Sequence, residues 1–175
     1  EGTMKLVDEF FIMELLKDLN ISKTYAGGSV ANTLSTISKL GGKCAFVGSR
    51  KNDKYGKLFS KSMEQEKIDL LNKENEEGKA SSLCLVLVTP NGERTMCTYL
   101  GASTSLNNEN LELSSLTKSN IIYLEGYLFD LPEAKDIFYE VVDKAKEYNY
   151  EVALSLSDPF CVERHRKDFI KLINK

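Results

Sequence analysis

A glycine pair followed by a serine and, one helical turn later, an asparagine is the first group of residues that could bind a ligand. Gly27 and Gly28 lack side chains, so backbone N–H groups there can approach a ligand closely. The helix expected from Ser29 would direct its free N–H groups and positive dipole end to the same place. Asn32 offers both a donor and an acceptor, which suits a vicinal diol. A plain loop-to-helix turn with Ser29 as its cap is the alternative interpretation.

Other nucleotide-binding and metal-binding motifs are absent from the sequence. It contains no G-x-x-x-x-G-K-[ST] phosphate loop and no G-x-G-x-x-G dinucleotide loop. None of the cysteines forms a C-x-x-C pair, and the single histidine, His165, gives no cluster of metal ligands. We therefore predict reduced thiols and no zinc site. The basic run from Arg164 to Lys167 is interpreted as a solvated helix face.

Composition and charge describe an ordinary globular chain. The 175 residues suffice for one domain, with 42% apolar and 28% charged residues. A net charge of −3 argues against a dedicated nucleic-acid binder. The longest apolar run, Leu83 to Val88, is too short to span a bilayer, and no signal peptide opens the chain. We expect a cytoplasmic protein without membrane contact, and the start at Glu1 suggests a longer gene product.

Hydrophobic periodicity predicts alternating helices and short buried strands. Helices are expected at 8–19, 29–40, 54–66, 132–148 and 160–173, and buried strands at 44–47, 121–124 and 151–156. This alternation predicts an α/β fold with a mostly parallel sheet and flanking helices. Two β-rich runs, 82–89 and 94–100, are joined by Pro90-Asn91-Gly92-Glu93, a strong hairpin signal. We expect this hairpin to project from the main layer as a small β sheet.

Several motifs, in order, resemble the signatures of PfkB-family carbohydrate kinases. The first signature is matched by Gly27-Gly28, Asn32, Gly41-Gly42, Phe46-Val47-Gly48, Asp53 and Gly56. The segments that resemble later parts of the family are Thr89–Thr95 and Leu100–Ser103 of its lid, Ile121–Tyr127 of its central strand, and Leu154–Phe160, in the adenosine-kinase version. The resemblance covers nearly the whole chain. It implies one partial Rossmann-like, ribokinase-like domain over 1–175, with a β lid formed mainly by 82–100.

The resemblance also implies a function. The intact protein would use ATP and Mg²⁺ to phosphorylate a primary hydroxyl of a ribonucleoside, adenosine in the first instance. The substrate-binding residues that it implies are Gly27, Gly28, Ser29, Asn32, Leu100, Ala102, Glu125 and Phe160. The family's string Gly-Ala-Gly-Asp, which carries the catalytic aspartate, has no counterpart here. We therefore assign no catalytic and no metal-binding residue to this chain, and expect it to bind neither ATP nor Mg²⁺ by itself.

Two residues point to different substrates. Phe160 stands where sugar kinases of the family often carry asparagine, and an aromatic side chain there favours a purine. It could instead be the first core residue of the last helix. Glu125 is more typical of the sugar kinases, so a ribokinase-like or fructokinase-like enzyme is an alternative. A truncated binding module without catalysis is a second alternative. The expected partner is a small nucleoside or sugar, and the resemblance leaves open a homodimer through the lid.

The missing catalytic string generates a first prediction: the 175-residue chain alone has no kinase activity. Loss of a general base costs about 10²–10⁴-fold in rate, and loss of electrostatic stabilisation of the transferred group multiplies that cost. The assay offers adenosine or a sugar with ATP to the purified chain. Phosphorylation above a control without enzyme would contradict the prediction.

Overall fold

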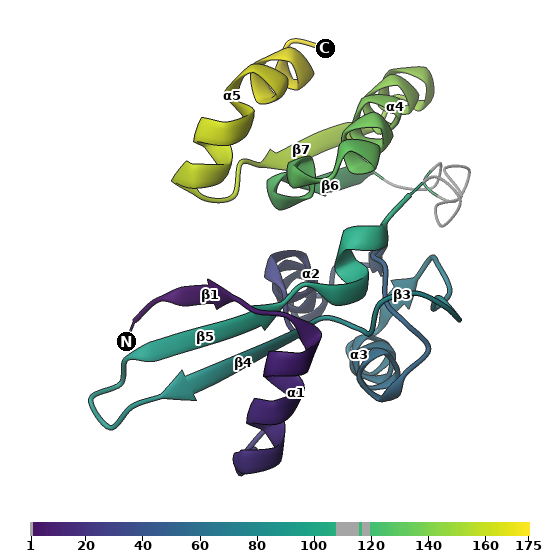
Figure 1. Ribbon diagram of the computed structural model, residues 1–175. Coiled ribbons are helices and arrows are strands. Elements are labelled where there is room, and N and C mark those ends of the chain that lie inside the picture. Colours follow the sequence, from purple (N-terminus) through teal and green to yellow (C-terminus); the bar gives the residue numbers. More distant parts are fainter. Residues whose placement is uncertain (1, 108–115, 117–119) are drawn as a thin grey trace.

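The computed structural model describes residues 2–107, 116 and 120–175 of the chain, arranged as Figure 1 shows. In chain order the elements are β1 (Met4–Leu6), α1 (Glu9–Asp18), α2 (Ser29–Lys39), β2 (Cys44–Phe46), α3 (Lys54–Gln65), β3 (Ile68–Leu70), β4 (Leu83–Val88), β5 (Arg94–Tyr99), β6 (Ile121–Glu125), α4 (Pro132–Tyr148), β7 (Glu151–Ser155) and α5 (Pro159–Ile173). The 3₁₀ helices η1 (Gly101–Ser105) and η3 (Gly126–Asp130) follow β5 and β6. Among these residues, no helix has the length and apolar character needed to cross a bilayer.

The predicted α/β architecture is confirmed, with helices packed beside parallel strands. β2 pairs in parallel with β3, and β6 pairs in parallel with β7. The described strands form three small sheets. β3 was not predicted, because its three residues, Ile68 to Leu70, are too few to show a strand periodicity. It is defined by its pairing with β2, from Cys44 opposite Ile68 to Phe46 opposite Leu70.

The hairpin expected between 82 and 100 is present. β4 and β5 pair antiparallel from Leu83 opposite Tyr99 to Val88 opposite Arg94. The connecting turn is closed by a hydrogen bond from the Thr89 N–H to the Glu93 carbonyl, 3.0 Å. β1, which was not predicted, adds a third strand parallel to β5. Figure 1 shows this three-stranded sheet extending away from α2 and α3.

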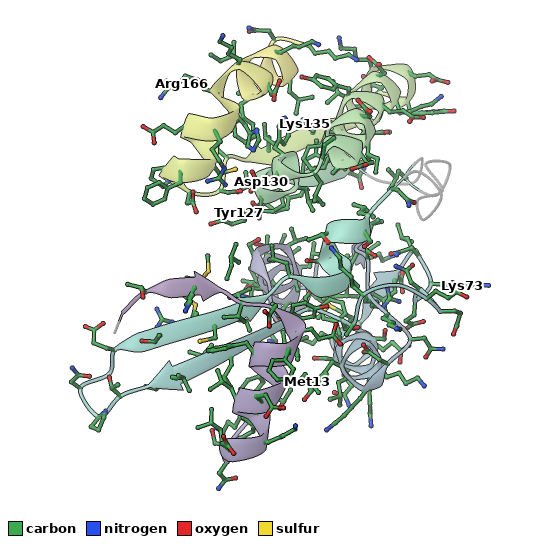
Figure 2. The ribbon with its side chains drawn as sticks, viewed as in Figure 1. Met13, Lys73, Tyr127, Asp130, Lys135 and Arg166 are labelled. Atoms are coloured by element: carbon green, nitrogen blue, oxygen red, sulfur yellow. The ribbon has the colours of Figure 1, made fainter. Side chains whose placement is uncertain are left out.

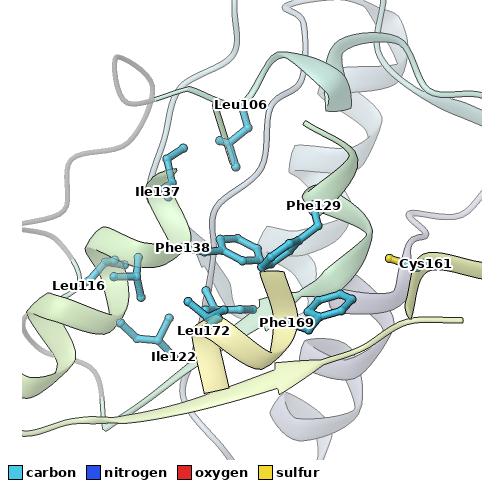
Figure 3. Close-up of a cluster of buried hydrophobic side chains, with 11 residues drawn as sticks. Leu106, Leu116, Ile122, Phe129, Ile137, Phe138, Cys161, Phe169 and Leu172 are labelled. Carbon is cyan, nitrogen blue, oxygen red and sulfur yellow. The ribbon is translucent and has the colours of Figure 1, made fainter. Parts of the chain in front are cut away.

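Two separate hydrophobic clusters hold the molecule together. The larger lies mainly in the C-terminal unit, residues 120–175, and also includes Leu106 and Leu116. In it the fully buried Phe129 ring stands 4.5 Å from the Phe169 ring and 5.3 Å from the Phe138 ring (Figure 3). The smaller lies beneath α2 and contains Ala31, Met63 and Ile68. Each cluster removes the apolar face of its helices from water, which is the main driving force for folding. The partly buried Val47 and Leu71 pack against the larger cluster from the N-terminal side.

The loop after β2 is organised by two polar anchors. Asp53 caps α3 by accepting a hydrogen bond from the Gly56 N–H (2.8 Å), and its other oxygen accepts one from the Ser81 N–H (2.8 Å). Burial alone would raise the pKa of Asp53, but these hydrogen bonds lower it. A side chain at position 56 would meet the Lys51 carbonyl oxygen at 1.9 Å. The fold therefore explains both residues: Asp53 makes the hydrogen bonds that fix the loop, and position 56 has no room for a side chain.

The second anchor is Arg50, a buried arginine. Its Nε donates to the Ser60 hydroxyl (2.8 Å), and Nη2 donates to the Asn72 carbonyl (3.0 Å). Nη2 also lies 3.4 Å from the Glu74 carboxylate, which accepts a 2.6 Å hydrogen bond from Ser60. The rigid donor fork of arginine lets one side chain join the loop, α3 and the segment after β3.

We predict that Arg50→Met lowers the free energy of unfolding by about 2–4 kcal/mol, because it leaves the Ser60 oxygen and the Asn72 carbonyl without their donor and the Glu74 carboxylate without its cation. Urea unfolding measures the change. Arg166→Met is the control, since Arg166 lies exposed on α5 and points away from the fold (Figure 2). Equal losses for the two variants would show that the Arg50 contacts contribute nothing specific.

Candidate functional site

The N-terminus of α2 begins with the glycine turn that the sequence singled out. Gly28 is the N-cap, and its φ of 106° lies in a region that side chains other than glycine rarely adopt. The Asn32 N–H donates to the Gly28 carbonyl, 3.0 Å, closing the first helical turn. Ser29 is the first residue within the helix and not its N-cap, and its hydroxyl donates elsewhere. The alternative interpretation of Ser29 as a simple cap is therefore wrong, and its hydroxyl has another partner.

That partner is Glu125, the last residue of β6. Ser29 Oγ donates to Glu125 Oε2 at 2.5 Å, across 96 positions of the sequence. Ser157 Oγ donates to Glu125 Oε1, also at 2.5 Å. The side chain of Glu125 is only 7% exposed, so its charge is separated from most solvent and each oxygen holds one hydroxyl donor. A buried carboxylate is tolerated when it is hydrogen-bonded in this way.

The turn between β7 and α5 forms the opposite side of this group. Ser157 has a φ of 67°, an uncommon conformation for a residue with a side chain. Its N–H donates to Ser155 Oγ at 3.1 Å. Gly126 leaves no room for a side chain, since an added Cβ would lie 2.5 Å from the Ser155 carbonyl oxygen and 2.9 Å from Ser157 Oγ. The close packing of these residues defines where Ser157 presents its hydroxyl.

Asp158 starts α5 and is held by two donors. Its Oδ1 accepts from the Cys161 N–H at 2.7 Å, and its Oδ2 accepts from the Tyr127 hydroxyl at 3.0 Å. The hydrogen bond from Cys161 is the main cause that lowers the pKa of Asp158. Burial, and then the Asp158 carboxylate, raise the pKa of Tyr127. Figure 2 shows Tyr127 on the side of the C-terminal unit that faces α2.

Phe160, in the first turn of α5, is 69% exposed. It belongs to neither hydrophobic cluster, so the alternative interpretation as the first core residue of this helix is wrong. Leu156, four residues before Phe160, and Tyr127, whose hydroxyl donates to Asp158, are also exposed. An exposed aromatic ring can stack on a flat apolar group of a ligand. Polar neighbours of the ring, such as Asp158, would then make the hydrogen bonds.

The two lid residues differ in accessibility. Leu100 is exposed and lines a shallow cavity of about 310 Å³, together with residues of β1, β5 and η1. Ala102 is 1% exposed, and its N–H donates to the Ala80 carbonyl at 2.8 Å. Of the residues proposed from the sequence, hydrogen bonds bring Ser29 and Glu125 together. Among the described residues, none joins Leu100, Ala102 or Phe160 to that pair.

The sequence reasoning missed several residues of this region. Asp158 before Pro159 has the signature of a helix N-cap, which would have drawn attention to it. Ser157 gave no such signal, because its role depends on Glu125.

The solvated face expected at Arg164–Lys167 is wrong for His165, whose side chain is 13% exposed and lies 2.5 Å from the Asp130 carboxylate. Arg164 also pairs with Asp130, through two hydrogen bonds of 3.1 and 2.9 Å.

Comparison with known proteins gives the same picture over nearly the whole chain. The model of the pfkB family carbohydrate kinases matches residues 13–174. The chain is 24% identical over 123 residues to the probable fructokinase-4 of Arabidopsis thaliana, covering 69% of this chain and 38% of that protein. It is 22% identical over 143 residues to the 5-dehydro-2-deoxygluconokinase of Mesomycoplasma hyopneumoniae (strain 232), covering 81% and 42%.

Solved structures are similar in fold. The adenosine kinase of Sinorhizobium meliloti superposes with a TM-score of 0.86 at 33% identity, covering 98% of this chain and 53% of that one. A probable sugar kinase of Rhizobium etli CFN 42 gives a TM-score of 0.87 at 31% identity, with 98% and 52% covered. The chain thus spans about half the length of these structures, and less than half of the curated relatives. The ribokinase-like fold class predicted from the sequence is confirmed.

The geometry of the α5 N-terminus predicts a pH-dependent stabilisation. Because the folded-state pKa of Asp158 lies below its ordinary value of 3.8, the stabilisation by this carboxylate is complete above that pH. The contribution is lost as the pH falls through the folded-state pKa. We therefore expect Asp158→Ala to destabilise the protein at neutral pH, and the difference from the unmodified protein to shrink as the pH falls below 3.8.

Urea unfolding between about pH 6 and pH 3 measures this difference. Asp136→Ala, which removes an exposed aspartate from α4, is the control for a general change in net charge. A difference for Asp158→Ala that stays constant over this range would contradict the assignment of the Asp158 carboxylate as the charged cap.

Proposed function

Since the chain belongs to the pfkB family of carbohydrate kinases, we propose that it forms the substrate-binding portion of an ATP-dependent kinase acting on a primary hydroxyl of a ribonucleoside, most favourably adenosine. The observation that carries the purine assignment is the exposed ring of Phe160. A sugar is nearly all hydroxyl and gains little from such a ring, whereas a purine offers a flat apolar face. The 33% identity to the adenosine kinase of Sinorhizobium meliloti favours the same choice.

The proposed contacts come from three segments of the chain. The Gly27 and Gly28 turn and Asn32 would hold the ribose hydroxyls, since they combine exposed backbone with an amide side chain. Phe160 would pack on the base, and Leu100 would approach from the lid. Ala102 would need a change in the lid to reach a ligand, because its side chain is buried here. In this arrangement the chain binds and orients the nucleoside.

A sugar as substrate is the second candidate, and it rests on specific observations. The curated relatives include probable fructokinases from Arabidopsis thaliana, and one similar structure is described as a probable sugar kinase. Glu125, which resembles the acidic residue of the sugar kinases, also stands at the end of β6. Its two oxygens already accept hydrogen bonds from Ser29 and Ser157, so a sugar hydroxyl would have to share or displace one of them.

The reaction proposed for the intact protein also requires ATP and Mg²⁺. Within the described part of the chain, no group of three or more His, Cys, Asp or Glu side chains is arranged to hold a metal ion. We assign no metal ligand to these residues. What the chain supplies is positioning, which can contribute a large part of the rate of a phosphoryl transfer.

We predict that Phe160→Ala in the intact enzyme lowers kcat/KM for adenosine by about 5- to 150-fold, the equivalent of losing a base–aromatic contact. Activity on ribose or fructose should change little, because neither sugar presents a flat face to the ring. The measurement compares kcat/KM for adenosine and for the two sugars in the same preparation. Phe10→Ala is the matched control, since Phe10 is 76% exposed on α1.

Equal losses for adenosine and the sugars would assign Phe160 a structural role. A clear preference of the unmodified enzyme for ribose or fructose over adenosine would refute the nucleoside assignment and support the sugar kinase.

A further inference from the structure

We propose that Ser29, Glu125 and Ser157 form a latch that sets the spacing between the two sides of the substrate site. In this assignment Glu125 is a positioning residue that acts through the two serines and does not itself contact substrate. The latch consists of the two hydrogen bonds from Ser29 Oγ and Ser157 Oγ to the Glu125 carboxylate, each 2.5 Å long. Its effect on catalysis rests on the proposed function, while its effect on the fold does not.

Both sides of the site are attached directly to the latch. Ser29 follows the Gly27 and Gly28 turn, which we assign to the ribose hydroxyls. Ser157 precedes Asp158, the cap of α5, and Phe160 stands in the first turn of that helix. Within the described residues, no hydrogen bond joins the glycine turn to the 157–160 segment directly. Besides the apolar packing of Leu106, Val47 and Leu71 in the larger cluster, the carboxylate that both serines share connects the two sides of the site.

The chemistry of this position suits a carboxylate, which accepts a hydrogen bond at each oxygen. Hydrogen bonds to an ionised carboxylate are shorter and stronger than those between neutral groups. The N-terminal ends of α2 and α5 both lie beside the latch, and the partial positive charge of a helix N-terminus favours a nearby anion. With an exposed fraction of 7%, the Glu125 carboxylate has little water to replace either serine if one is lost.

The backbone conformation at Ser157 allows a substitution that removes the hydroxyl without disturbing the turn. With its φ of 67°, this residue is in a region that glycine adopts without strain. Ser157→Gly therefore removes the hydroxyl and relaxes the backbone at the same time, so the two effects on stability oppose each other. A functional loss in this variant would come from the missing hydrogen bond and not from a disrupted turn.

The first test measures hydrogen exchange of the backbone amides in the absence of substrate. Hydrogen exchange of the intact protein is compared with that of Ser29→Ala, Ser157→Gly and Glu125→Gln. We expect faster exchange in the first turn of α2 in Ser157→Gly, although residue 157 is far from that helix in the sequence. Thr36→Ala is the control, because it removes a hydroxyl of α2 that donates to the Asn32 carbonyl at 3.0 Å and does not contact Glu125. Unchanged exchange in α2 for both Ser157→Gly and Glu125→Gln would overturn the latch.

The second test uses steady-state kinetics with adenosine. Loss of positioning should raise KM on the order of 10-fold for Ser29→Ala and for Ser157→Gly, with kcat changed much less. A purely structural defect would instead lower the concentration of active enzyme and leave KM unchanged. Ser29→Thr retains a hydroxyl and should restore KM. Once one serine is gone the connection is broken, so the double variant should be little worse than either single one.

Two kinetic results would overturn the positioning role. One is a raised KM in Glu125→Gln with normal KM in both serine variants, which would mean that Glu125 contacts the substrate directly. The other is fully additive effects of the two serine substitutions. If the unmodified enzyme does not act on adenosine, the proposed function fails, and the exchange experiment alone decides whether the latch exists.

Discussion

A buried carboxylate between two serine hydroxyls connects the segments on which the site depends. Glu125 ends β6, Ser29 begins α2, and Ser157 stands between β7 and α5. Leu106, Val47 and Leu71 from the N-terminal side pack in the larger hydrophobic cluster, so apolar packing and these hydrogen bonds together hold the two sides. Hydrogen bonds are directional, whereas the hydrophobic effect is not. The hydrogen-bonded carboxylate at this junction can therefore add a directional restraint to that packing.

The surroundings of Glu125 match what a buried charge requires. An isolated carboxylate in a low-dielectric interior is costly, and hydrogen bonds to each oxygen offset that cost. Gly126 permits the close approach of Ser157, because any larger residue would collide with the turn. Gly28 similarly permits the backbone conformation that places Ser29 at the start of α2. Gly126 thus provides the space for the hydrogen bond between Ser157 and Glu125, and Gly28 provides a backbone geometry that other residues resist.

The exposed residues that we assign to the substrate site have a mixed chemical character. Gly27, Gly28 and Asn32 offer polar groups, whereas Phe160 and Leu100 offer apolar ones. Such a combination suits a ligand with hydroxyls at one end and a flat apolar face at the other. The exposed aromatic side chain of Phe160 is the part of this surface that we propose to favour a purine over a sugar.

The sequence by itself determined the features that rest on local interactions. The helices that begin after Asp8, Asp53 and Asp158 were placed within one or two residues, and each aspartate accepts a hydrogen bond from the backbone three residues later. The hairpin was predicted because Asn91 and Gly92 specify a tight turn between two β-rich runs. The motifs that resemble the pfkB family were sufficient for the fold class and for the glycine turn.

Only the tertiary structure decided the features that join distant segments. β1 and β3 exist because of the strands beside them, which a three-residue run cannot reveal. The burial of His165, the exposure of Phe160 and the burial of Ala102 depend on which elements pack nearby. Glu125 was singled out as a ligand residue, yet its two serine partners are 96 and 32 positions away. Capping and turn signals act over three or four residues, so contacts across such separations leave no local pattern to read.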